Sequence, residues 1–300
     1  MKVSIITPFY KGRKYLGSYR DTISRNAAFL AEKNKKEGRD DSLEVIIIND
    51  SPEDSVNSFG ETPFKNVRFL TNDRNRGIQY SRVRGLSEST GDYVIFLDQD
   101  DFLRKDAVYL FMREAEKNPG KVIISNALFE TKGSNEPVYK TEKAKELVWD
   151  KKTYLTVGIQ IISPGQCLIP KNLIPSFWKE HLISKNGADD YYLWILMLSM
   201  GIGAKYLDAP LYVHQANETN LSTDTEKTDV SSYEFIKILR GCSDVSSRDL
   251  DTLEKMLKYK AAFRKGNLMK KGLLSLRHPV LFFTNVHYKK ITATYYGDRR

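Results

Sequence analysis

The first 125 residues of this chain alternate between short apolar runs and segments with helical spacing. The apolar runs, rich in β-branched residues, are Val3–Thr7, Leu43–Ile48, Val67–Thr71, Tyr93–Leu97 and Lys121–Ser125. The segments between them with apolar residues at helical spacing are Arg13–Lys33, Ile78–Ser89 and Asp106–Lys117. This alternation predicts an α/β fold with a mainly parallel sheet and helices on both faces.

One of these predicted strands ends in a cluster of acids. Tyr93–Leu97 is followed directly by Asp98-Gln99-Asp100-Asp101. Three carboxylates at the end of a buried strand need partners, and a divalent cation that also binds substrate phosphates would supply one. The alternative is a solvated acidic turn that caps the next helix, since Asp is a good N-cap residue.

Two further predicted strands end in polar groups. Val3–Thr7 leads into Pro8-Phe9-Tyr10, and Leu43–Ile48 leads into Asn49-Asp50. The carboxyl ends of parallel strands share one edge of a sheet, and ligands bind in the crevice outside that edge. We therefore expect one crevice to collect all three strand ends.

The composition indicates the size of the hydrophobic core and the cellular compartment. The 300 residues are 41% hydrophobic, enough for one large core or for one domain with an appendage. The two cysteines, Cys167 and Cys242, indicate no disulfide framework and favour a reducing compartment. No apolar run has the length of a membrane span, and the first apolar run is too short for a signal peptide.

Positive charge is concentrated at the end of the chain. Residues 255–300 hold 12 Lys and Arg and one acid, Asp298, while the whole chain has a net charge of +9, so residues 1–254 are slightly acidic. A basic tail with helical spacing suits an anionic partner such as a membrane surface, a lipid phosphate or nucleic acid. The alternative is a helical lid or a dimer contact.

The middle of the chain is less regular. After a turn-rich break at Lys132–Pro137 we expect short strand-like pieces. Further on, Gln166–Pro170 reads as a strand, Asp189–Met200 as a helix, and residues 204–214 as two strands broken by Pro210. From Ser231 onward the pattern is helical.

Five stretches, in this order, resemble the family 2 glycosyltransferases. They are V-S-I-I-T-P-F-Y (Val3–Tyr10), V-I-I-I-N-D-S (Val45–Ser51), N-R-G-I-Q-Y-S-R-V-R-G (Asn75–Gly85), G-D-Y-V-I-F-L-D-Q-D-D (Gly91–Asp101) and A-D-D-Y-Y-L-W (Ala188–Trp194). The resemblance implies a Rossmann-like GT-A domain over residues 1–222, with a nucleotide-sugar-binding half at 1–130 and an acceptor half at 131–222. Residues 223–300 then form a helical basic C-terminal extension.

The resemblance assigns several residues to the donor nucleotide. Pro8 and Tyr10 match the loop that holds the nucleobase, where an aromatic ring can stack on uracil. Asp50 matches an acid that reads the base, although Asn49 replaces the family's other acid at this place. The alternative for Tyr10 is a ring packed on the following helix.

Two more residues are expected near the donor. Arg82 matches an arginine that offsets the charge of the diphosphate, with a surface position on a helix as the alternative. Asp98 matches the acid that contacts the ribose or a metal-bound water.

The resemblance also implies a metal site for Mn²⁺ or Mg²⁺. Asp100 matches the metal-binding acid of the family's D-x-D motif, and the adjacent Asp101 is the other candidate. His214 follows a predicted strand at the place of a late histidine that completes the metal shell. The alternative for His214 is a loop histidine without a ligand role.

The general base is expected at Asp190. Asp189-Asp190 lies where the family has Glu-Asp at the start of a helix, and the second acid deprotonates the acceptor hydroxyl. The positive end of the helix favours the ionised carboxylate. The alternative is a plain first-turn acid. Trp194, one turn further on, is expected in the core.

The resemblance therefore implies an inverting, metal-dependent glycosyltransferase that uses a nucleotide sugar. The base-reading acid favours a UDP-sugar, and thymine or another base is the alternative. The chain lacks the Gln-x-x-Arg-Trp segment and the membrane helices of processive relatives, which favours addition of a single sugar. We expect a lipid-linked glycan acceptor in surface polysaccharide biosynthesis, at the cytoplasmic face of the membrane, and no nucleic-acid partner.

Two other classes of protein fit the sequence less well. A sugar-nucleotide nucleotidyltransferase needs a glycine-rich basic loop after the first strand, and Pro8–Gly12 does not match one. A non-catalytic glycan- or nucleotide-binding protein would not need Asp98, Asp100 and Asp190 together.

Overall fold

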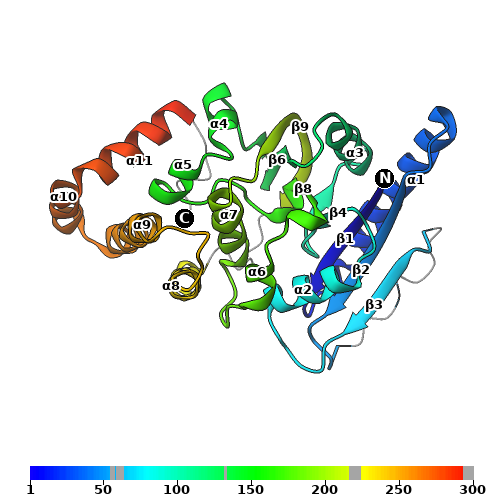
Figure 1. Ribbon diagram of the computed structural model, residues 1–300, viewed down its shortest axis with the longest axis horizontal. Helices are drawn as coiled ribbons and strands as arrows, with labels where there is room; N and C mark the ends of the chain where they lie inside the picture. Colours follow the sequence, from blue (N-terminus) through cyan, green and yellow to red (C-terminus); the bar gives the residue numbers. More distant parts are fainter. Residues whose placement is uncertain (55–57, 59–63, 132–133, 216–223, 293–300) are drawn as a thin grey trace. The chain divides into compact units, whose positions relative to one another are not determined.

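The computed structural model describes residues 1–54, 58, 64–131, 134–215 and 224–292, which belong to two compact units (Figure 1). The α/β unit consists of residues 1–137, 162–174 and 203–217. The helical unit consists of residues 138–161, 175–202 and 218–300. The chain thus crosses between the units several times. The predicted division into functional segments 1–130, 131–222 and 223–300 is one of roles and stays a prediction.

The α/β unit is built on one mixed sheet. Its strands are β1 (Lys2–Phe9), β2 (Ser42–Asn49), β3 (Val67–Thr71), β4 (Tyr93–Phe96), β5 (Phe102–Leu103), β6 (Val122–Thr131), β7 (Ser134–Pro137), β8 (Cys167–Pro170) and β9 (Ala204–Gln215). The order is β3-β2-β1-β4-β8-β6-β9-β5, with β7 paired to β6. The neighbours β3, β2, β1 and β4 are all parallel, which confirms the predicted α/β class.

The register of the parallel strands brings their carboxyl ends to one edge. Phe9 of β1 lies opposite Asn49 of β2, and Asn49 lies opposite Thr71 of β3. Leu97, just beyond β4, donates its backbone N–H to the carbonyl of Ile6. The three polar strand ends named from the sequence therefore share one edge, as predicted.

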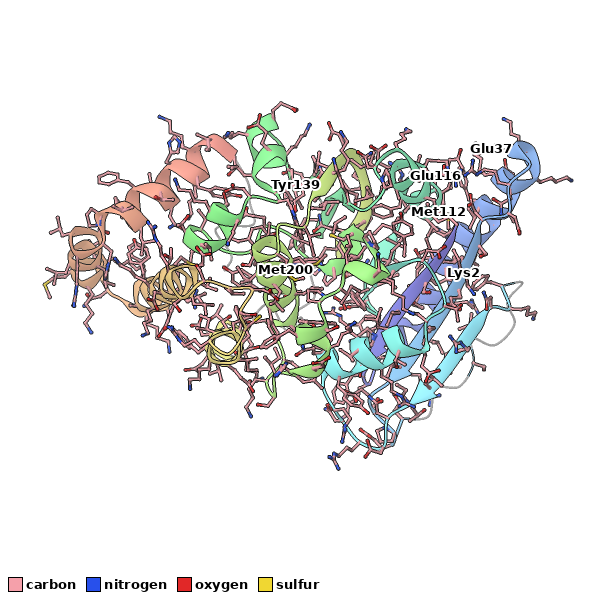
Figure 2. All side chains as sticks on the ribbon, viewed as in Figure 1. Lys2, Glu37, Met112, Glu116, Tyr139 and Met200 are labelled. Carbon is pink, nitrogen blue, oxygen red and sulfur yellow. The ribbon has the colours of Figure 1, made fainter. Side chains whose placement is uncertain are left out.

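Helices of the α/β unit form where the sequence indicates them. They are α1 (Leu16–Glu37), preceded by a 3₁₀ turn at Arg13–Tyr15, α2 (Ile78–Glu88) and α3 (Ala107–Lys117). α1 and α3 pack together, and Figure 2 labels Glu37 on α1 and Met112 and Glu116 on α3. Tyr109 of α3 donates a hydrogen bond of 2.7 Å to Glu37 at the end of α1. α2 packs on β1 and β2 so closely that a Cβ at Gly85 would lie 2.3 Å from a methyl of Ile6.

The structure corrects the prediction for residues 204–214. We expected two strands broken by Pro210, but β9 is one strand that pairs with β6 throughout. The register shifts on both sides of Asn126, the residue opposite Pro210. Such a local irregularity lets a strand continue past a proline, which cannot donate to the ladder.

The segment after β7 is also different from the prediction. In place of strand-like pieces it forms two short helices, α4 (Glu142–Leu147) and α5 (Lys151–Thr156). Each begins with a capping side chain: Thr141 accepts from the N–H of Ala144, and Asp150 accepts from the N–H of Thr153. These N-caps are the sequence signal that the prediction overlooked.

The helical unit packs around α7. Its further helices are α6 (Ser176–Glu180), α7 (Asp189–Ser199), α8 (Thr225–Leu239), α9 (Ser247–Lys265), α10 (Leu268–Arg277) and α11 (Pro279–Thr292). α7 is buried on nearly every side, as a helix apolar all round should be. Trp194 is fully buried, which confirms its predicted core position, and Tyr192 stacks on Phe235. None of the helices in the described residues is long and apolar enough to cross a bilayer.

A buried carboxylate ties β2 to the start of β1 and to the loop before β4. Glu44 of β2 accepts hydrogen bonds of 2.6 Å from Ser4 Oγ, 2.6 Å from the N–H of Thr90 and 2.9 Å from Thr90 Oγ1. Burial alone would raise the pKa of Glu44, but the donors on Ser4 and Thr90 and the charge of Lys2 lower it to about 2.

We therefore expect part of the stability of the fold to be lost in acid. Because the pKa of Glu44 is lower in the folded state, its contribution is complete above the unfolded pKa of about 4.3 and disappears as pH falls toward 2. Glu44→Gln should cost on the order of 2 kcal/mol at pH 7, and the difference from wild type should shrink toward pH 2. Urea unfolding at a series of pH values measures this; a pH-independent difference would contradict it.

Candidate active site

Asp98 lies just beyond β4 and is held by protein groups on both carboxylate oxygens. Arg82 Nη2 on α2 donates to Oδ1 at 2.7 Å, and Ser163 Oγ donates to Oδ2 at 3.2 Å. The Arg82 side chain is 3% exposed and that of Asp98 is 27% exposed. The acid is thus fixed in place while part of it still faces solvent.

Arg82 was predicted to offset the charge of a diphosphate, with a surface position on a helix as the alternative. The structure buries its side chain, pairs it with Asp98 and places its guanidinium 5.9 Å from the ring centroid of Phe96. A surface position, the alternative considered from the sequence, is therefore wrong. The contact that the structure gives Arg82 fixes the orientation of Asp98, and the predicted diphosphate contact is untested.

Asp101 is held by β9 on the other side of the acidic cluster. Oδ1 lies 3.1 Å from His214 Nδ1 and accepts from the N–H of Gln215 at 3.0 Å, and Oδ2 accepts from the hydroxyl of Tyr212. The residue is 1% exposed. Asp101 therefore connects the end of β4 to the end of β9, and both of its oxygens have protein partners.

This buried contact shifts the pKa of both aromatic partners. Burial, and after it the negative charge of Asp101, raises the pKa of Tyr212 well above its ordinary value, so the hydroxyl stays a donor. Burial alone would lower the pKa of His214, but the hydrogen bond to Asp101 and the charges of Asp101, Asp100 and Asp98 raise it. The three acids thus create a negative potential around the imidazole.

Asp100 lies between these two anchored acids and is partly exposed. Among the residues that the structure describes, no group of three or more His, Cys, Asp or Glu forms a ready-made metal cage. Mg²⁺ and Mn²⁺ at phosphate sites do not need one, because one or two carboxylates and the phosphate oxygens share the coordination. Asp100 is a partly exposed hard oxygen donor whose charge acts on the imidazole of His214 on β9, and these two groups fit such a metal.

The sequence reasoning missed the role of Gln99. Its Oε1 accepts from the N–H of Tyr10 at 2.9 Å, and its Nε2 donates to the Tyr10 carbonyl at 3.1 Å. This pair of bonds joins the loop after β1 to the loop after β4. An amide side chain both donates and accepts, so the middle residue of the acidic motif was the available signal.

Pro8 lies near the end of β1, and Tyr10 directly follows the strand. Pro8 is half-buried at the end of the strand, and the Tyr10 side chain is exposed, with Lys11 Nζ 5.3 Å from its ring centroid. With 43% of the residue open to solvent, Tyr10 is not buried in the core. Stacking on a base and the alternative, packing on the following helix, both stay predictions.

Asp50, the predicted base reader, organises the loop before α2. Oδ1 accepts from Asn72 Nδ2 at 2.7 Å and from the N–H of Arg76 at 2.8 Å, and Oδ2 accepts from the N–H of Gly77 at 2.8 Å. Gly77 has φ of +90°, a conformation that suits glycine. The structure thus gives Asp50 a part in shaping this loop, and contact with a base stays a prediction.

The hydrogen bonds of Asn49 account for an amide at the position where the family motif has an acid. Its Oδ1 accepts from both the N–H and the hydroxyl of Ser51, and its Nδ2 donates to the carbonyl of Asp54 at 2.9 Å. An ionised Asp at this position could not make the last bond. Ser51 in turn accepts from the N–H of Lys11, which links the loops after β1 and β2.

Asp189 and Asp190 lie in the helical unit, in the first turn of α7. Asp189 is buried, and Asp190 is partly exposed, with Oδ1 accepting from the N–H of Tyr191 at 2.7 Å. The backbone of Asp189 is fixed by Trp178 Nε1, which donates to its carbonyl at 3.0 Å. Of the pair, Asp190 is therefore the acid that a substrate could reach, and its catalytic role stays a prediction.

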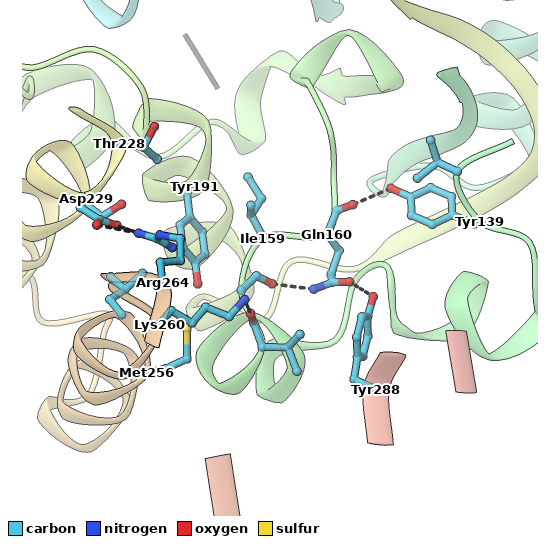
Figure 3. A pocket seen from close by; sticks show the side chains of 15 residues that line it. Tyr139, Ile159, Gln160, Tyr191, Thr228, Asp229, Met256, Lys260, Arg264 and Tyr288 are labelled. Atoms are coloured by element: carbon cyan, nitrogen blue, oxygen red, sulfur yellow. Dashed lines mark hydrogen bonds and ion pairs between the residues drawn. The ribbon is translucent and has the colours of Figure 1, made fainter. Parts of the chain in front are cut away.

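A small cavity of about 90 Å³ lies in the helical unit, between α7, α8, α9, α11 and the segment Val157–Gln160 (Figure 3). Side chains of the C-terminal helices hold that segment: Lys260 donates to the carbonyl of Val157, and the Tyr288 hydroxyl donates to Gln160 Oε1. Tyr139 donates to the carbonyl of Gln160 at 2.9 Å. These bonds fix the chain just before it continues to Ser163.

We expect Tyr212→Phe to destabilise the protein by about 2 kcal/mol, because it removes a donor from the buried carboxylate of Asp101. Tyr206→Phe is the matched control, since Tyr206 is half-buried on the same strand. Denaturant unfolding of the two variants measures the difference. Equal losses would show that the contact with Asp101 adds no stability.

The chain is similar in sequence or in fold to several known proteins. A glucosyl-dolichyl phosphate glucuronosyltransferase from Haloferax volcanii is 30% identical over 132 residues, which are 43% of this chain and 38% of that protein. The chain thus spans well under half of the length of this relative.

Two solved structures share the fold. A crystal structure of S. aureus TarS 1-349 in complex with UDP-GlcNAc matches with a TM-score of 0.58 at 16% identity over 90% of this chain and 78% of the other. The mannosyltransferase PcManGT from Pyrobaculum calidifontis, in complex with GDP-Man and Mn²⁺, matches with a TM-score of 0.52 at 14% identity over 97% of this chain and 84% of the other.

The decisive match is to a family model. The model described as glycosyl transferase family 2 matches residues 4–171, more than half of the chain, and includes β1, β2 and the acidic end of β4. The predicted GT-A fold and the predicted family are therefore confirmed: the chain belongs to glycosyl transferase family 2.

Proposed function

We propose that this glycosyltransferase takes one sugar from a nucleotide sugar, a UDP-sugar, and transfers it with inversion to a glycan acceptor in surface polysaccharide biosynthesis. The observation that carries the proposal is the edge of the sheet where the loops after β1, β2 and β4 are tied together. At that edge Tyr10 is exposed and Asp100 is partly exposed.

The donor nucleotide would use the residues at the ends of β1, β2 and β4. Tyr10 presents an exposed ring that can stack on a base, with Pro8 beside it in the strand. Asp50 shapes the adjoining loop, and Asp98, positioned by Arg82, offers a fixed carboxylate oxygen to the ribose. TarS, of the same fold, was solved with UDP-GlcNAc, which is compatible with a UDP-sugar here.

A divalent cation, Mn²⁺ or Mg²⁺, would be held by Asp100 and His214. We assign Asp101 a positioning role instead, because both of its oxygens already have partners on β9. A carboxylate beside Nδ1 leaves Nε2 of the imidazole as the ligand atom, a common arrangement for metal-binding histidines. When bound, such an ion offsets the charge that develops on the departing diphosphate.

Asp190 would act as the general base. The acceptor hydroxyl oxygen attacks the anomeric carbon, the bond from that carbon to the diphosphate oxygen breaks, and its electron pair leaves with UDP. The hydroxyl proton passes to Asp190, and the single displacement inverts the anomeric centre. Asp190 lies in the first turn of α7, where the positive end of the helix dipole favours a negative charge.

The acceptor would be a lipid-linked glycan, and the reaction would take place in the cytoplasm at the inner face of the membrane. The relative from Haloferax volcanii has a glucosyl-dolichyl phosphate in its name, which supports an acceptor of this kind. Cys167 and Cys242 are free thiols, as a reducing compartment favours.

Replacing Asp190, the proposed base, distinguishes an effect on donor binding from an effect on the transfer step. Asp190→Asn should lower the rate of acceptor-dependent UDP release by about 10²- to 10⁴-fold while donor binding, followed by thermal shift, is retained. Glu180→Gln, an exposed acid of α6 in the same unit, should behave as wild type. An Asp190→Asn enzyme with unchanged turnover would exclude the base role.

Replacing the proposed metal ligand tests the cation. We expect Asp100→Asn to lower UDP release about 100-fold at limiting Mn²⁺ and to need more Mn²⁺ for half-maximal activity. Asp21→Asn, an exposed acid of α1, is the control. Full activity of the wild type in chelator would refute metal dependence, and an unaltered Mn²⁺ response of Asp100→Asn would refute this ligand.

A further inference from the structure

Exposed apolar side chains gather on the last two helices of the helical unit. Over the described residues, most of the large apolar side chains that are open to solvent lie within the 19 residues from 268 to 286. They are Leu268 (88% exposed), Met269 (71%), Leu273 (60%), Leu276 (79%), Val280 (76%), Phe283 (66%) and Val286 (48%). A concentration of this kind marks an interaction surface, because scattered single residues would be expected otherwise.

These side chains form the outer faces of α10 and α11, because the inner faces of both helices are occupied. α10 packs on α9, where Lys271 Nζ lies 5.4 Å from the ring centroid of Phe263. α11 packs on α4 and α5 and buries Leu281 and Tyr288. Figure 1 shows the two helices following each other beside these partners.

The outer face of α10 has the spacing of an amphipathic helix. Met269, Leu273 and Leu276 are separated by four and three residues, so they form one stripe. Lys270 and Arg277 are exposed and lie along one side of this stripe. The helix therefore presents an apolar band with one cationic edge.

The charge of this surface is of one sign. Between Leu268 and Thr292 there are five Lys and Arg residues and no Asp or Glu. In a symmetric dimer the same patch of both copies would meet. The positively charged side chains of one copy would then face those of the other and repel them. An occupant must instead be both apolar and anionic, and a bilayer surface with acidic lipids has both properties.

The lengths of the helices define how such a surface could be used. α10 has 10 residues and α11 has 14, whereas a helix needs roughly 20 to cross the hydrocarbon core. Helices of this size with apolar side chains on one face and lysines beside them lie in the plane of the membrane interface.

We propose that α10 and α11 form an interfacial docking surface for an anionic lipid bilayer, with Met269, Leu273, Leu276 and Phe283 entering the interface. The basic side chains of Lys270, Arg277 and Lys290 contact the lipid headgroups. This inference rests on the exposed faces of the two helices alone and holds for any donor sugar.

The test is co-sedimentation of the full chain with vesicles of phosphatidylcholine, either alone or with about 30 mol % phosphatidylglycerol. Wild type should bind the anionic vesicles and be released by salt, since surface attraction is screened. Lys270→Gln/Arg277→Gln/Lys290→Gln should weaken binding on the order of 100-fold. Leu276→Gln/Phe283→Gln should weaken it by about tenfold or more.

Matched control variants replace exposed apolar and basic side chains outside α10 and α11. Met200→Gln/Val230→Gln replaces two apolar residues that are 47% and 49% exposed, and Lys35→Gln/Lys36→Gln/Lys121→Gln removes three exposed charges. Both should bind vesicles as wild type does, and circular dichroism and thermal unfolding should show all variants folded.

Three outcomes would overturn the proposal. One is equal binding of wild type to neutral and anionic vesicles. Another is binding of the α10–α11 variants that equals that of the controls. The third is light scattering that shows a wild-type dimer without affinity for vesicles, dissociated by Leu276→Gln/Phe283→Gln, which would identify the face as a contact between copies of this chain.

Discussion

The contact between Arg82 and Asp98 is the constraint on which the candidate site depends. A guanidinium buried to 3% exposure needs an anion, and an acid at the end of a buried strand needs donors, so each satisfies the other. Their contact joins α2 to the end of β4, and Ser163 adds the segment before β8. Removing Asp98 would take this partner away from the buried guanidinium of Arg82, and breaking a buried pair in this way typically costs about 3–5 kcal/mol.

The other two acids of the cluster, Asp100 and Asp101, differ in their surroundings. Asp101 takes its donors from Tyr212 and the end of β9, more than a hundred residues away in the sequence. Asp100, between two acids that are held, is left partly exposed. The three neighbouring carboxylates differ in burial, and this difference underlies the proposal that Asp100 binds the metal and Asp101 has a positioning role.

The C-terminal helices serve a structural purpose beside the one proposed for their outer faces. Lys260 of α9 and Tyr288 of α11 hold the segment Val157–Gln160, and Gly158 within it has φ of +123°. This segment leads along the chain to Ser163, a partner of Asp98. The basic extension is therefore part of the folded enzyme and not an addition that could be removed without effect.

Most of the fold of the first 125 residues could be predicted, because each strand and helix there has its own period and its own turn residues. The prediction failed where tertiary contacts decide local structure. β9 continues through Pro210 because pairing with β6 on both sides absorbs a register shift. α4 and α5 are too short for a periodic pattern and are marked only by the caps Thr141 and Asp150.

By itself, the sequence determined the βαβ order, the shared edge of the three strand ends and the membership in the family. These depend on local periodicity, on the rules of parallel sheets and on motifs. Only the tertiary structure decided which oxygen has which partner: Arg82 on Asp98, Gln99 on Tyr10, Asp101 on β9. The physical reason is that a buried polar group must be satisfied, and residues distant in sequence can supply that partner only after the chain has folded.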